Sequence, residues 1–164
     1  MKDNIILRLV YTFFVGILLA FFVGVGISTF YEAPKAPAYP SELNYAKTNI
    51  TEQQKTVQKA YDEKNQQHQA SRKLYSRNVS IMALVAAVLL FIISVALERK
   101  ISVLADGMML GGVFTLLYSI GRGVASENNK YLFVAVTVGL VAALILGYCH
   151  FATPEKPRTA KTKR

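Results

Sequence analysis

The sequence predicts an all-α integral membrane protein with four transmembrane helices and a long amphipathic extramembrane helix between the first and second spans. Three observations support this fold class: four long apolar runs, charge concentrated outside those runs, and a stretch without Gly or Pro leading into the second run. A helix needs about 20 apolar residues to cross the hydrocarbon core of a bilayer. Because lipid offers no partner to an open backbone group, runs of this length are helical.

The apolar runs divide the chain into four segments. Residues 1–30 hold a short basic N-terminus and the first span, 9–30. Residues 31–78 form an extramembrane segment, 79–152 hold three further spans (79–97, 101–120 and 131–152), and 153–164 form a basic tail. The first run exceeds the 7–15 residues typical of a secretory signal and lacks a small-x-small cleavage site. We therefore expect a retained anchor.

The segment between the first two spans predicts an extramembrane helical arm. It opens with Pro34, Pro37 and Pro40, a pattern typical of an extended, polyproline-like chain. Ser41 is a good N-cap, and no Gly or Pro occurs again before Gly107, so 41–78 is expected to be an amphipathic helix that continues into the second span. Two shorter helices folded back on each other remain the alternative. The apolar stripe is narrow, so it needs a protein partner, a second copy, or the membrane surface.

The charge balance favours contact with anionic lipid. The chain carries 19 Lys and Arg against 10 Asp and Glu. Basic segments beside spans attract anionic head groups, and we expect such contacts from the tail residues Lys156, Arg158, Lys161, Lys163 and Arg164. The tail lacks aromatic residues, so nucleic acid is not an expected partner.

Basic residues also bear on orientation, because loops rich in Lys and Arg stay in the cytoplasm. The tail and the short 98–100 loop favour an orientation with both termini in the cytoplasm. The basic residues Arg72, Lys73 and Arg77 beside the second span favour the reverse. We expect the first orientation, in the plasma membrane.

Small residues recur every four positions within the spans. Such rows let helix backbones approach closely where lipid removes the hydrophobic driving force. They predict packing within one four-helix bundle or between protomers. The residues concerned are Gly16, Ala20, Gly24, Ala83, Ala87, Gly107, Gly111, Gly139, Ala143 and Gly147.

Asp106 is the candidate functional residue within the spans. An acid inside a span is costly and marks an ion-handling site or a pair with a cation. Asp106 lies close to the start of the third span, so an interfacial role is the alternative, and Arg99 or Lys100 could pair with it. No catalytic, metal-binding or cofactor-binding motif is recognisable, and we expect no enzyme activity.

Two functional classes follow. The first is a non-enzymatic scaffold or assembly subunit that binds a protein partner, or itself, through 41–78, as a coiled coil would. The second is a small oligomeric transporter or channel subunit that uses Asp106 for protons or ions.

Overall fold

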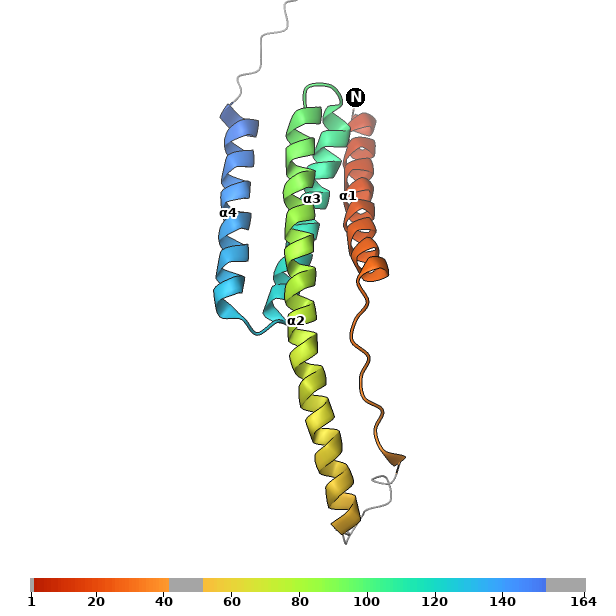
Figure 1. The fold of residues 1–164 in the computed structure, drawn as a ribbon. Coiled ribbons are helices and arrows are strands. Elements are labelled where there is room, and N and C mark those ends of the chain that lie inside the picture. Colours follow the sequence, from red (N-terminus) through yellow and green to blue (C-terminus); the bar gives the residue numbers. More distant parts are fainter. Residues whose placement is uncertain (1, 42–51, 153–164) are drawn as a thin grey trace, which may run out of the picture.

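The computed structural model describes residues 2–41 and 52–152 of the chain, and within these ranges it is helical without strands (Figure 1). The helices are α1 (Lys2–Phe30), α2 (Glu52–Leu97), α3 (Ser102–Val124) and α4 (Asn129–Ala152). The first three are long and apolar enough to cross a membrane, whereas Asn129–Ile145 of α4 counts as a shorter apolar helix. The all-helical prediction is confirmed, as are three helices suited to a membrane.

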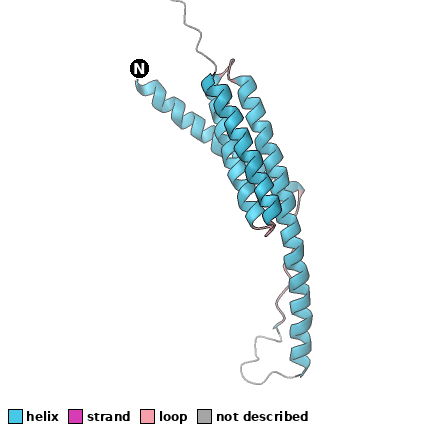
Figure 2. Ribbon diagram, turned by 90° about the vertical axis from the view of Figure 1, so that its left-hand side faces the viewer, coloured by secondary structure: helices cyan, strands magenta, loops and turns pink. Residues whose placement is uncertain are grey.

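The helices run alternately up and down. The N-terminal end of α1, the turn between α2 and α3, and the C-terminal end of α4 lie together at the top of Figure 1. The turn between α3 and α4 lies at the opposite end, from which the first part of α2 projects. In Figure 2 the start of α1 stands away from the other helices, so α1 crosses the bundle at an angle.

α2 joins a polar N-terminal part to an apolar part long enough to cross a membrane, in one helix of 46 residues. The sequence between Pro40 and Gly107 has no residue that breaks a helix, so nothing interrupts the backbone hydrogen bonds. We call residues 52–78 the arm; at 1.5 Å per residue they extend about 40 Å. The arm is therefore continuous with the apolar part of α2. The hairpin alternative requires a helix within 42–51, which lies outside the described residues.

The interface between α2 and α3 is built from small side chains. The buried residues of α2 recur at intervals of four and three, the spacing of a coiled-coil seam. They include Ser76, Ser80, Ala83, Ala87, Leu90 and Ser94. Ala105, Gly112, Thr115 and Ser119 are among the buried residues of α3. Small residues on facing helices allow close backbone approach, so α2 and α3 form the centre of the bundle.

The proline-rich segment packs along the arm. Residues 31–40, which we call the lead, run antiparallel to it: Tyr31 stacks on Tyr75 with ring centroids 5.1 Å apart, and Tyr39 meets Tyr61 edge-on at 5.3 Å. Within the lead Tyr31, Pro34, Pro37 and Pro40 are half-buried. This three-residue period is that of a polyproline II helix, which keeps one face on its partner. Figures 1 and 2 both show the lead beside the arm. Part of the arm's stripe is thus covered by its own chain.

Candidate functional site

Asp106 forms an ion pair with Arg8, at the end of the bundle that holds the N-terminus. Nη2 of Arg8 lies 2.5 Å from Oδ2 of Asp106 and also donates to the hydroxyl of Ser102. The side chain of Arg8 is 48% exposed and that of Asp106 is 30% exposed. The pair joins the second turn of α1 to the second turn of α3 and gives the acid a positively charged partner.

Arg8 holds the position that the sequence analysis gave to Arg99 or Lys100. Those two residues lie exposed in the turn between α2 and α3. The turn is short, and its backbone is fixed by bonds from the amides of Lys100 and Ile101 to the carbonyl of Leu97. The structure therefore brings a cation from α1 to Asp106.

The crossing of α1 and α3 sets up this pair. A Cβ added to Gly107 would lie 2.9 Å from Cγ1 of Val15, and one added to Gly111 would lie 2.9 Å from Cβ of Leu19. Both distances are shorter than carbon atoms tolerate, so glycine is needed at both positions. Gly16 completes the contact from the α1 side, where an added Cβ would meet Leu110 at 3.0 Å. Because α1 lies this close to α3, Arg8 reaches Asp106 about two turns before the crossing.

The other predicted packing residues fall into two groups. The first group is packed: Ala83 and Ala87 are fully buried. Gly139 of α4 faces Leu116 of α3, where an added Cβ would lie 2.9 Å from Cδ2 of that leucine. The second group faces outward or into a groove among the described residues: Ala143 is exposed, an added Cβ at Gly24 or Gly147 meets no atom within 4 Å, and Ala20 lines a groove with Gly24.

Hydroxyl groups link three helices in the interior, which the sequence analysis missed. Oγ of Ser80 donates to the carbonyl of Ser119 at 2.6 Å, and Oγ of Ser119 donates to the carbonyl of Ser80 at 2.8 Å. The phenol of Tyr131 in α4 donates to Oγ of Ser80 at 3.1 Å. Ser94 makes a further bond to the carbonyl of Ala105. The four- and three-residue spacing of Ser76, Ser80 and Ala83 is the sequence signal that could have revealed this seam.

A second missed cluster lies where the arm leaves the bundle. We call Tyr31, Tyr75, Asn78 and Arg122 the arm-base cluster. The phenol of Tyr75 donates to the carbonyl of Tyr31, and the amide of Asn78 donates to the phenol of Tyr31. The guanidinium of Arg122 lies 5.1 Å above the ring of Tyr75, a cation–π contact. The cluster ties the start of the lead, directly after α1, to α2 and α3 at the base of the arm.

Beside this cluster an ion pair fixes the turn between α3 and α4. Nζ of Lys73 lies 2.6 Å from Oε2 of Glu127. Glu127 has a φ of 54°, a left-handed conformation that a non-glycine residue seldom adopts. The arm therefore contacts the last turn of the bundle as well as α1.

The described residues offer little for metal or acid–base chemistry. No group of three His, Cys, Asp or Glu side chains that could hold a metal ion occurs among them. The tail residues predicted to contact lipid head groups lie outside the described ranges. No protein-family model, curated protein or solved structure matches the chain.

Proposed function

We propose that the protein is a non-enzymatic membrane scaffold, whose arm holds a protein partner at a fixed distance from the bilayer. The continuity of α2 carries this proposal. Since the arm and the span are one helix, the partner's position is coupled to the membrane without a hinge. The lead and the arm-base cluster brace the arm on the side of α1.

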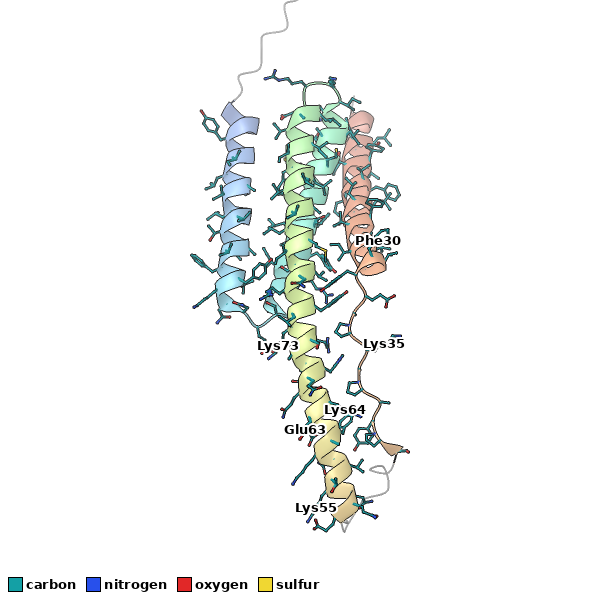
Figure 3. The ribbon with its side chains drawn as sticks, viewed as in Figure 1. Phe30, Lys35, Lys55, Glu63, Lys64 and Lys73 are labelled. Carbon is teal, nitrogen blue, oxygen red and sulfur yellow. The ribbon has the colours of Figure 1, made fainter. Side chains whose placement is uncertain are left out.

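The exposed surface of the arm favours a second protein over a second copy. A coiled coil between copies needs an apolar stripe on each helix, and the lead already covers part of this stripe. The remaining faces carry charged side chains of both signs, among them Lys55, Glu63 and Lys64 (Figure 3). Lys59 is exposed there as well. Charges of both signs select a partner by complementarity and set its rate of association.

The proposed placement is an integral protein of the plasma membrane, with α4 as the fourth span and both termini in the cytoplasm. The alternating direction of the helices supports it, because both ends of the described chain then lie on one side. The tail residues Lys156, Arg158, Lys161, Lys163 and Arg164 would meet anionic head groups on that side.

The ion-handling alternative has less support. An acid that carries protons or cations must exchange them, whereas the carboxylate of Asp106 is held by Arg8 and lies at one end of α3. An ion pair that fixes the register of two helices is the simpler role for both residues.

The scaffold proposal is tested by photo-crosslinking in intact cells. A photo-reactive side chain at Glu63, which is exposed on the arm, should give one discrete product with a second protein. The matched control is Phe133, which is 73% exposed on α4, outside the arm. It should not give that product.

A helix-breaking variant shows whether the arm must be rigid. Ala70→Pro removes a backbone donor and interrupts the helix, so it should abolish the product at Glu63 while Ala70→Ser retains it. Equal patterns at Glu63 and Phe133 would refute the scaffold. A product that contains two copies of the chain would show that the arm binds a second copy, through 41–78, and not a second protein.

A further inference from the structure

An apolar groove of about 650 Å³ opens between α1 and α3. This volume is within the range of small-molecule sites. Its walls are side chains from both helices, including Phe13, Phe21, Val25, Phe114 and Tyr118. Gly24 is among the lining residues, and because an added Cβ there meets no described atom within 4 Å, the space beside it is open. The groove follows α1 from Phe13 to Ser28, along the part that is suited to the membrane.

The groove leads toward a cation at the arm end. Its last lining residues are Ser28 on α1 and Tyr118 on α3. Tyr31 follows three residues after Ser28, and Arg122 follows one helical turn after Tyr118. Both contact the ring of Tyr75, so the arm-base cluster lies beyond this end of the groove.

Among the described residues, Arg122 has no carboxylate partner. No ion pair to it occurs within residues 2–41 and 52–152, and its buried Nε has no hydrogen-bond partner there. Its contact with the ring of Tyr75 does not neutralise its positive charge. Guanidinium groups bind phosphate oxygens through charge-assisted, often paired hydrogen bonds.

We propose that this groove binds one phospholipid with an anionic head group, with an acyl chain between α1 and α3 and the phosphate at Arg122. Apolar walls, with an arginine one helical turn beyond their last residue on α3, match the two parts of such a lipid. A transmembrane helix of a second copy would match the walls but would leave the charge without a partner. A second concavity of about 690 Å³, lined by apolar residues of α1 alone, serves as the comparison.

The test uses a tryptophan reporter, since the chain has no tryptophan of its own. Phe114→Trp places the reporter in the groove, and Phe133→Trp places it on the exposed surface of α4. Each protein is reconstituted in phosphatidylcholine vesicles that contain a minor fraction of chain-brominated phosphatidylglycerol or, in parallel, chain-brominated phosphatidylcholine. Bromine quenches a tryptophan that it touches.

The groove reporter should be quenched more by the brominated phosphatidylglycerol. The preference should be on the order of fivefold, the factor that one basic residue contributes near a membrane surface. The reporter on α4 should show no preference. Arg122→Gln should abolish the preference by removing the charge, and Gly24→Leu should abolish it by filling the groove.

The matched control is Gly26→Leu, which adds the same volume to the second concavity of α1. It should leave the preference intact, and helical content measured by circular dichroism verifies folding of each variant. Equal quenching by the two lipids, or a preference that survives Arg122→Gln, would overturn the anionic lipid site. No quenching by either lipid would show that protein, such as a second copy, fills the groove.

Discussion

Ser80 and Ser119 exchange hydrogen bonds across the interface of α2 and α3, each hydroxyl donating to the backbone carbonyl of the other residue. The two hydroxyl oxygens lie 3.2 Å apart, within hydrogen-bond distance of each other. Each hydroxyl hydrogen is nevertheless directed to a backbone carbonyl. Tyr131 donates to Ser80 in addition, so one serine connects three helices. This polar link lies in the buried seam from which the arm continues.

Each serine should contribute separately to stability. Ser119→Ala should lower the free energy of unfolding by about 1 kcal/mol, the usual value for an interhelical bond in membranes. Ser80→Ala should lower it further, because it also removes the acceptor of the Tyr131 phenol. Because each bond ends on a backbone carbonyl, which remains in the alanine variant, the double variant should show nearly additive losses, within about 0.5 kcal/mol. Unfolding by dodecyl sulfate in mild detergent measures all three. A larger departure from additivity would show that the two hydroxyls chiefly bond to each other and not to the carbonyls.

Neutralising Asp106 should have a small effect. Asp106→Asn keeps the shape and removes the charge, and a half-exposed pair contributes about 1 kcal/mol or less. The single reversals Arg8→Asp and Asp106→Arg should each lower the free energy of unfolding. The double variant, which exchanges the two charges, should recover that loss. Expression, stability and ion flux in proteoliposomes are the measurements. A proton or cation flux that Asp106→Asn abolishes in a folded protein would restore the ion-handling function.

The close approach of α1 to α3 should depend on glycine. Gly107→Ala and Gly111→Ala should each cost about 1–3 kcal/mol of unfolding free energy, as is typical of overpacking. The added methyl group would lie 2.9 Å from Val15 or Leu19. Gly147→Ala is the control, because a Cβ there meets no described atom within 4 Å, and it should cost nothing. Equal effects at all three positions would argue against the crossing.

The orientation is tested by labelling single cysteines in intact cells after Cys149→Ser. An impermeant thiol reagent should label a cysteine at Glu63, on the arm, and not one at Arg99, in the turn between α2 and α3. Lysed cells, in which both sites must react, provide the control. Labelling of Arg99 alone would place the arm in the cytoplasm.

The sequence was sufficient to predict features that depend on residues close together along the chain. Apolar length located α1, α2 and α3, and the absence of helix breakers before Gly107 predicted the continuity of α2. The predicted first span began at residue 9, whereas α1 begins at Lys2, because an apolar run marks the part suited to lipid and a helix can extend into polar sequence.

Features that depend on helix register could not be predicted. Arg8 reaches Asp106 only because α1 crosses α3 at Gly107 and Gly111, and no spacing within one segment encodes that crossing. The contact of the lead with the arm likewise depends on Tyr31 meeting Tyr75 and Tyr39 meeting Tyr61 after a chain reversal. The apolar stripe of the arm indicated that some surface must cover it. Only the three-dimensional structure shows that the lead covers part of it.

The rigidity of the arm is the central claim, and a distance between two spin labels tests it most directly. Labels at Lys55 and Ile81, both exposed on α2, should lie about 39 Å apart along a continuous helix. The account predicts one narrow distance distribution at that value in lipid nanodiscs. A broad distribution, or a population at much shorter distances, would show a hinge within the arm and would contradict the scaffold.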